Sequence, residues 1–466
     1  MTIRRTSSMS KYVKPMIIPL TVISIGILSM YMGLNLKQII VLSIFTLEMT
    51  GIILYWELKL AFATSGVFLL FLTGALSMKY FAKFIYVDVL LFLLCMMIVV
   101  KYLEDRGFFE LMVFYLTSKI RNAYILLASL MVITAILSSL VGVITAALFI
   151  VPIILRLTLR YHVDSIPFIL MVVFAANVGS GATPVGSPVG IIFALRVGLS
   201  FSEFIRWSAP ISYFSLAVII LYCFKMFSED LRELNERMKL VGRASTGYES
   251  SINRAEVLKC TLLIVSIIIS ITFHHDIERL LELERGTALI ISAMGGAFTV
   301  LFMERRRIRD IIEVGVDWYT LLFFAFLFAS LGALEHVKIN ELFSHMILYI
   351  SGEETLRLLF LLSWSCGVLS AFLDNVLVVA FFISVIRELQ MIGVEVYSLW
   401  WGTLFAATYF GNATIIASTA NIVAVSMLES RRAGRITFLQ WSKYGLIVSI
   451  LSLSAALTLL YVQNML

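Results

Sequence analysis

The stretches AANVGSGATPVGSPVG (residues 175–190) and YFGNATIIASTANIVA (residues 409–424) are uncharged and rich in glycine, alanine, hydroxyl and amide side chains. Each interrupts a long apolar run, and the two occupy matching places in the two halves of the chain. Such a break allows a membrane helix to unwind and to turn backbone carbonyls and helix ends toward a solute at mid-membrane. The repeated pattern therefore predicts a secondary transporter with its binding site at the two breaks.

The composition indicates whether this chain folds in water or in a lipid bilayer. Of its 466 residues, 60% are hydrophobic and 14% are charged, and the mean hydropathy is +0.97. A soluble core of this length could not hide so much apolar surface, so we expect an all-α polytopic membrane protein in a lipid bilayer. The formal net charge of +6 requires no nucleic acid as a partner, because basic residues gather on cytoplasmic loops of membrane proteins.

Apolar runs of about 20 residues are long enough to cross a bilayer as helices. Two longer runs, 122–155 and 358–385, carry Gly, Ser or Asp-Asn near the middle, so each is expected to form a re-entrant hairpin. The runs 166–199 and 397–428 are also long, because each contains one of the breaks. With those two included, about eleven crossings are expected, near residues 16–33, 38–56, 60–78, 87–103, 166–199, 209–227, 257–273, 286–303, 315–333, 397–428 and 443–464.

The basic residues predict the orientation and the domain order. The cluster Arg305–Arg307 and the pair Arg431–Arg432 fall on cytoplasmic loops if the N-terminus is cytoplasmic. The positive-inside rule therefore favours that orientation, and we expect a multi-pass protein of the plasma membrane. The expected segments are an N-terminal tail with an extra first helix (1–37), a first repeat (38–227), a cytoplasmic linker (228–256) and a second repeat (257–466).

The two halves match each other in one nearly constant register. Gly181-Ala182-Thr183 falls on Asn412-Ala413-Thr414, and Ser138 falls on Ser370. Each repeat is expected to contain an odd number of crossings, so the second must enter the membrane from the opposite side. The pattern predicts an inverted repeat, an arrangement from which alternating access follows.

Asp374 is a lone formal charge within its apolar run, at the expected tip of the second hairpin. A carboxylate at that depth costs about 2.5–3.5 kcal/mol on insertion scales, so it usually has a partner or binds an ion. Asp374 is therefore a candidate ion ligand, and the neighbouring Asn375 adds a neutral donor and acceptor. The structural alternative is that Asp374 caps backbone amides of the hairpin turn.

The breaks offer side-chain and backbone oxygens that suit Na⁺ or a proton-bearing water better than a soft metal. We take Asp374 and Asn421 as the candidate Na⁺ ligands. Small-residue helix packing also enriches glycine and hydroxyl residues and is the alternative interpretation. The candidate binding residues are Asn177, Gly179, Ser180, Gly181, Thr183 and Ser187 in the first half and Asn412, Thr414, Ser418, Thr419 and Asn421 in the second.

Glu104 and Glu335 form a matched pair of acidic residues at helix ends, in KYLEDRGFFE and GALEHVKINE. Their position favours a role at the membrane interface or at a hinge. Direct proton transfer is the alternative role.

Several segments carry a family resemblance: LLFFAFLFASLGALE (321–335), SAFLDN (370–375), GNATIIASTANIVA (411–424) and, in the first half, NVGSGATPVGSPVG (177–190). Residues 60–464 resemble the ion transporter superfamily, in the branch of arsenite permeases, D-type sodium/proton antiporters and the melanosomal P protein, which has a citrate transporter-like domain. The resemblance implies a scaffold domain, a mobile transport domain with two opposed hairpins and, in many members, a homodimer.

The first half departs from that branch in a consistent direction. Gly142-Val143 stands where the branch usually has Asp-Asn, and residues 186–190 read Gly-Ser-Pro-Val-Gly in place of Gly-Asp-Pro-Pro-Asn. The departure predicts asymmetric coupling, with one cation or proton handled by Asp374 and residues 412–421. No conventional cation site is then expected in the first half.

The first functional hypothesis is a secondary active transporter of an inorganic ion or small oxyanion, coupled to H⁺ or Na⁺ and needing no other cofactor. A Na⁺/H⁺ antiporter without a separate anionic substrate and a passive ion channel are the alternatives. The spans lack HExxH and GxSxG motifs, so we expect no catalytic residues and no enzyme. The breaks and hairpin tips contain no basic residue, which disfavours citrate and other multivalent carboxylates.

Overall fold

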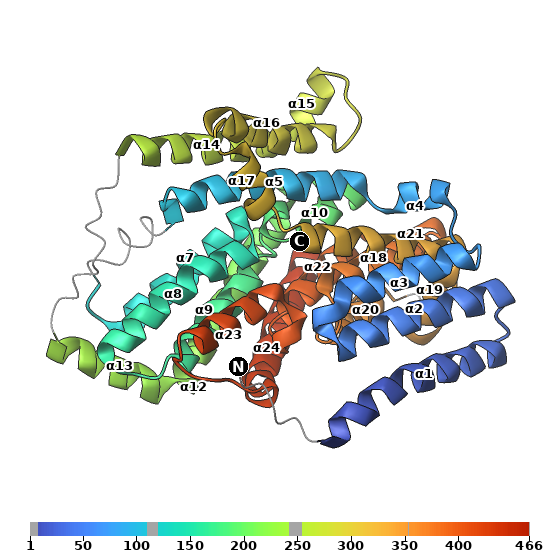
Figure 1. The fold of residues 1–466 in the computed structure, drawn as a ribbon, viewed down its shortest axis with the longest axis horizontal. Helices are drawn as coiled ribbons and strands as arrows, with labels where there is room; N and C mark the ends of the chain where they lie inside the picture. Colours follow the sequence, from blue (N-terminus) through green and yellow to red (C-terminus); the bar gives the residue numbers. More distant parts are fainter. Residues whose placement is uncertain (1–7, 110–119, 242–253, 353, 466) are drawn as a thin grey trace. The chain divides into compact units, whose positions relative to one another are not determined.

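The structure is a computed structural model that describes residues 8–109, 120–241, 254–352 and 354–465 (Figure 1). Every regular element within these ranges is a helix. The fold therefore confirms the expected all-helical architecture of a polytopic membrane protein. The chain divides into two compact units, each assembled from separate stretches of sequence.

Unit 1 comprises residues 1–90, 317–353 and 380–394. In it α1 packs on α2, α2 packs on α3, and α18 packs on both α2 and α3. A capping box starts α2, since the Asn35 side chain accepts from the Gln38 amide and the Gln38 side chain accepts from the Asn35 amide. Its helices are α1 (Ser8–Tyr31), α2 (Leu36–Leu54), α3 (Lys59–Leu72), α4 (Met78–Phe84), α18 (Trp318–His336), α19 (Ile339–Ser351) and most of α21 (Asn375–Met391).

Unit 2 comprises residues 91–316, 354–379 and 395–466. At its centre lie two 14-residue helices, α9 (Ile166–Gly179) and α22 (Tyr397–Phe410), nearly all of whose residues are buried. Around them pack α7 (Ala123–Val141), α8 (Val143–Tyr161), α12 (Ala209–Met226), α20 (Thr355–Ser370), α23 (Thr419–Ser430) and α24 (Phe438–Met465). Unit 2 also contains most of α5 (Val87–Asp105), α10 (Pro188–Ile192), α13 (Ser228–Val241), α14 (Arg254–Thr272), α15 (His274–Leu280), α16 (Thr287–Met303) and α17 (Ile308–Gly315).

Helices occur at each of the apolar runs that the sequence marks as a crossing. Seven described helices are individually long and apolar enough to cross a membrane, or eight if α4 and α5, bent by 48°, form one span. The broken runs fall below that length because α9 stops at Gly179 and α22 stops at Phe410. The arms of the first expected hairpin, α7 and α8, are 19 residues each, so either could cross, and re-entrance stays a prediction.

The expected cytoplasmic linker, 228–256, begins as helix α13. Its central part, residues 242–253, lies outside the described residues. The two compact units cut across the two sequence repeats, because each repeat contributes residues to both units. The repeat boundaries thus stay predictions, and the compact units are a separate level of organisation.

Candidate functional site

The two breaks of unit 2 have the same backbone. After α9 the chain forms a short 3₁₀ turn at Pro184–Gly186, and after α22 it forms the matching turn at Ile415–Ala417. The residue before each turn is a threonine in extended conformation, with φ −138° and ψ 163° at Thr183 and φ −136° and ψ 162° at Thr414. The matched sequences therefore fold into matched unwound segments.

The helix end that leads into each expected hairpin turn lies against the break of its own half through matched hydrogen bonds. Ser138 Oγ, near the end of α7, donates to the Ala176 carbonyl over 2.6 Å, and Ser370 Oγ, at the end of α20, donates to the Ala407 carbonyl over 3.0 Å. A second bond in each half runs in the opposite direction, from Thr183 Oγ1 to the Ser139 carbonyl and from Thr414 Oγ1 to the Ala371 carbonyl. Each hairpin tip is thereby fixed to the break of its own half.

Three asparagine side chains join the two breaks. Asn177 Nδ2 on α9 donates to Asn412 Oδ1 over 2.8 Å and to Asn421 Oδ1 over 2.9 Å. Asn177 is 3% exposed, and Asn412 and Asn421 are fully buried. We call these three residues the amide cluster. It is neutral, and it connects the first half of the chain directly to the second.

The amide cluster also holds the unwound backbone of the second break. Asn421 Nδ2 donates to the carbonyls of Gly411 (2.7 Å) and Thr414 (2.8 Å). The Trp441 indole N–H donates to the Asn412 carbonyl over 2.9 Å. These bonds satisfy carbonyl groups that a continuous helix would otherwise pair, which is a requirement for broken helices at membrane depth.

Several oxygens at the site remain available to a ligand. Asn177 Oδ1 accepts no hydrogen bond from any described residue and lies 3.5 Å from the position of a Cβ added at Gly411. The hydroxyls of Ser418 and Thr419, at the start of α23, likewise form no hydrogen bond with the residues described. A ligand could therefore bind these oxygens without breaking a bond present in the structure.

The polar residues of the first break are mostly engaged in structural contacts. Ser187 Oγ caps α10 by accepting from the Gly190 amide, and Ser180 Oγ donates to the Asn177 carbonyl. The Gly181 carbonyl accepts from Ser208 Oγ. Gly179 lies against the backbone of α7, where an added Cβ would come within 2.4 Å of Ala135. In this half the packing interpretation explains most of the predicted residues.

Asp374 lies at the second hairpin tip and caps α21. Its Oδ1 accepts from the Val376 amide over 2.9 Å, and the residue is 8% exposed. This is the structural alternative raised from the sequence, and a capping carboxylate retains lone pairs for further ligands. Asn375, the first residue of α21, is half-buried. The Val376 bond holds the Asp374 carboxylate against the start of its own helix.

The structure does not bring Glu104 and Glu335 into the amide cluster. Glu104 lies near the end of α5, where Lys101 pairs with it at 3.7 Å and with Asp105 at 2.9 Å. Glu335 is half-buried in the last turn of α18 and belongs to unit 1. A hinge or proton role for either residue stays a prediction.

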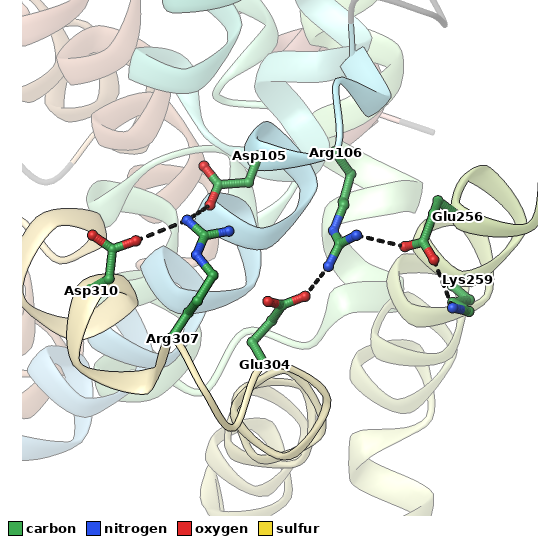
Figure 2. A network of polar contacts seen from close by, with 7 residues as sticks. All are labelled: Asp105, Arg106, Glu256, Lys259, Glu304, Arg307 and Asp310. Carbon is green, nitrogen blue, oxygen red and sulfur yellow. Dashed lines mark hydrogen bonds and ion pairs between the residues drawn. The ribbon is translucent and has the colours of Figure 1, made fainter. Parts of the chain in front are cut away.

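Ion pairs link the end of α5 to three other helices of unit 2 (Figure 2). Arg106 lies between Glu304, at the end of α16, and Glu256, at the start of α14. Arg307 pairs with Asp105 over 2.9 Å and with Asp310 of α17 over 2.8 Å. These half-exposed charges lie where the positive-inside rule predicts a cytoplasmic surface.

Sequence reasoning missed one buried charge. Glu48 is the lone charged residue between Gln38 and Trp56, and it is fully buried on α2. The criterion that selected Asp374, an isolated carboxylate in an apolar run, would have selected Glu48 as well.

Packed apolar helices, two of them broken and joined by buried amides, define the architecture of a membrane transporter. The model of the family described as citrate transporter matches residues 49–401 and 284–466 of this sequence. The chain belongs to this family.

Similar proteins occur in bacteria and mammals. An uncharacterized transporter of Mycobacterium tuberculosis is 30% identical over 390 residues, which are 81% of this chain and 86% of that protein. The 46 kDa membrane protein of Mycobacterium leprae is 29% identical over 79% of this chain and 84% of its own length. The human P protein is 23% identical over 83% of this chain and 55% of its own length. The resemblance stated from the sequence motifs is confirmed.

Proposed function

We propose that this protein is a secondary active transporter of an inorganic ion or small oxyanion, coupled to H⁺ or Na⁺ by alternating access. The amide cluster carries the proposal, because Asn177 of one half bonds directly to Asn412 and Asn421 of the other. A ligand that replaces any of these bonds changes how the two halves are joined. Binding is thereby linked to conformation, which a carrier requires.

The chemistry of the site favours a small ligand of low charge. Amide N–H groups, hydroxyls and helix N-termini can bind an oxyanion, while carbonyl and amide oxygens can bind a hard cation. The breaks at 175–190 and 409–424 contain no lysine or arginine. A multivalent carboxylate would therefore lose its hydration without gaining an opposite charge. For that reason we do not extend the substrate in the family's description to this chain.

The coupling cation is assigned to the second half. Ser418 and Thr419 of this half offer open oxygens, Asn177 of the first half adds another from α9, and Asp374 supplies the carboxylate of the second tip. Asn421 is a less suitable Na⁺ ligand than the sequence indicates, because its Oδ1 already accepts from Asn177 and its Nδ2 holds two carbonyls. A cation would have to displace the Asn177 bond to reach Asn421.

The arrangement in the membrane belongs to the same proposal. The two compact units correspond to a scaffold and a mobile transport unit, and the halves form an inverted repeat in a homodimer of the plasma membrane with a cytoplasmic N-terminus. Reactivity of single cysteines introduced at residues 305 and 431 with an impermeant reagent tests the orientation. Labelling from outside intact cells at either position would contradict it.

Two measurements test the transport activity. Thermal unfolding of the purified protein is followed with Na⁺, Li⁺, arsenite, phosphate, chloride, dicarboxylates and changing pH, because a ligand that binds the folded state raises stability by RT ln(1 + [L]/Kd). The ligand found is then supplied to proteoliposomes with an imposed H⁺ or Na⁺ gradient. Accumulation above the external concentration supports a coupled carrier, whereas flux that only equilibrates indicates a channel. Proton movement driven by Na⁺ alone, with no anionic ligand, indicates the antiporter alternative.

A further inference from the structure

Unit 1 contains a carboxyl group that the proposed transport site does not use. Glu48 on α2 is 0% exposed, and neither carboxyl oxygen has a hydrogen-bond partner among the described residues. An ionised carboxylate placed there would lose its hydration shell without a compensating charge or donor. A neutral carboxylic acid avoids most of that cost.

The helices around Glu48 leave space for the carboxyl group. On α3, a Cβ added at Gly66 would lie 2.4 Å from Glu48 Oε2 and 2.8 Å from its Cδ. The absence of a side chain at Gly66 thus makes the space that the carboxyl group occupies. On α18, the buried Ser330 hydroxyl lies near the same carboxyl, and within the described residues it completes no hydrogen bond of standard geometry.

The ionisable residue of α3, Lys59, lies at the start of that helix, away from Gly66, and contacts aromatic rings. It lies about 10 Å from Gly66 along the helix axis, and its ammonium group lies over the rings of Trp56 (4.7 Å) and Phe323 (4.5 Å). No described residue forms a hydrogen bond with the Glu48 oxygens. Other ionisable residues on the helices packed with α2 are Lys37 on α2 itself, Glu57 before α3, Tyr319, Glu335 and His336 on α18, and Tyr31 at the end of α1.

We propose that Glu48 is a proton-binding site within the membrane-embedded part of unit 1, whose carboxyl group holds a proton until water reaches it. A proton fits this site better than Na⁺, because a metal cation needs several oxygen ligands and Glu48 belongs to no cluster of three or more His, Cys, Asp or Glu side chains among the described residues. The inference rests on unit 1 alone. Its test does not depend on whether the amide cluster takes part in transport.

Infrared spectroscopy of the full chain in lipid bilayers tests the proposal without a transport assay. At neutral pH the wild-type protein should show the carbonyl stretch of a protonated carboxyl group, and ¹³C labelling of the glutamate side chains should shift that band to lower frequency. Glu48→Gln should remove the shifted band. The matched control is Glu57→Gln, at an exposed carboxyl of the same unit, and it should leave the band unchanged.

Three outcomes would overturn the proposal: a wild-type spectrum without a glutamate-derived band, a band that persists in Glu48→Gln, or a band that disappears on adding Na⁺ at constant pH. If Glu48→Gln does not fold, Gly66→Ala provides the second test. Its added methyl group meets the carboxyl oxygen at 2.4 Å and should shift the frequency of the band. An unchanged frequency in Gly66→Ala would also contradict the assignment.

Discussion

The breaks after α9 and α22 share a backbone conformation but use their side chains differently. Ser187 caps α10 through the Gly190 amide, whereas the corresponding Ser418 does not cap α23. The first hairpin turns at Gly142, and the second turns at Asp374, whose carboxylate caps α21. The duplicated element is therefore the backbone with its hairpin contacts. The chemical groups available to a ligand lie mainly in the second half and at Asn177.

The packing of the two hairpins shows the same kind of difference. On the first break Gly179 lies against Ala135 of α7, and on the second Phe410 lies against Gly367 of α20. The glycine lies on the broken helix in the first half and on the preceding helix in the second, and the close approach is kept. The total side-chain volume between the two helices is therefore constrained by packing, whereas the residue at each single position can differ.

The largest effect is expected when the two halves are disconnected at the amide cluster. Asn421→Ala removes one of the two acceptors of Asn177 Nδ2 and the donor to two buried carbonyls, which should lower the free energy of unfolding by about 3 kcal/mol or more. Transport should be lost. Thermal unfolding and proteoliposome flux measure both effects.

The control for Asn421→Ala is Ser426→Ala, at an exposed position of the same helix. It should leave unfolding temperature and flux near the wild-type values. Wild-type flux in Asn421→Ala would show that the amide cluster is not part of the transport site.

The exchanged packing contacts should respond unequally to an added methyl group. Gly179→Ala places a Cβ 2.4 Å from the Ala135 backbone, whereas Gly367→Ala places one 2.8 Å from the Phe410 ring, which can rotate. Overpacking usually lowers the free energy of unfolding by about 1–3 kcal/mol. We expect the loss for Gly179→Ala at the upper end of this range and the loss for Gly367→Ala at the lower end. Unfolding curves of the two variants, measured in parallel, give the loss in the free energy of unfolding for each. Equal losses would mean that both contacts relax to the same extent.

The two roles of Asp374 can be separated by two substitutions. Asp374→Asn keeps a side-chain oxygen that can accept from the Val376 amide, so the free energy of unfolding should change little. Coupled transport should be abolished, because the charge that offsets desolvation of the cation is gone. Asp374→Ala should in addition lose about 1 kcal/mol with the cap.

The result for Asp374→Asn decides whether the second half differs from the first in cation binding. Normal coupled flux in this variant would leave Asp374 with a capping role alone. The matched variant of the first tip, Gly142→Ala, places a methyl group in open space at φ +100°. It should slow transport through backbone strain and should not change the number of cations per cycle.

The sequence predicted the helix breaks and the family because both depend on local chemistry. Glycine and proline cannot continue a membrane helix without cost, and the segments that follow Gly181 and Asn412 both continue with Ala-Thr. The bonds of Asn177 to Asn412 and Asn421 could not be predicted, since they join residues far apart in sequence. The cap at Asp374 depends on one hydrogen bond, and a composition argument cannot separate it from ion binding. Glu48 is an isolated carboxylate like Asp374, but it lies outside the two breaks and the expected hairpins, on which the site prediction rested.

The smallest effect is expected at the two serines that start α10 and α23. Ser187→Ala removes a cap and should cost about 1 kcal/mol, whereas Ser418→Ala removes no described hydrogen bond and should stay within about 0.5 kcal/mol of wild type. For ligand affinity the order should reverse, because the Ser418 hydroxyl is open to a ligand and Ser187 is engaged with the Gly190 amide. Measuring unfolding with and without the ligand from the thermal screen gives both quantities for each variant. If Ser187→Ala weakens ligand binding more than Ser418→Ala does, the ligand-binding chemistry is not concentrated in the second half.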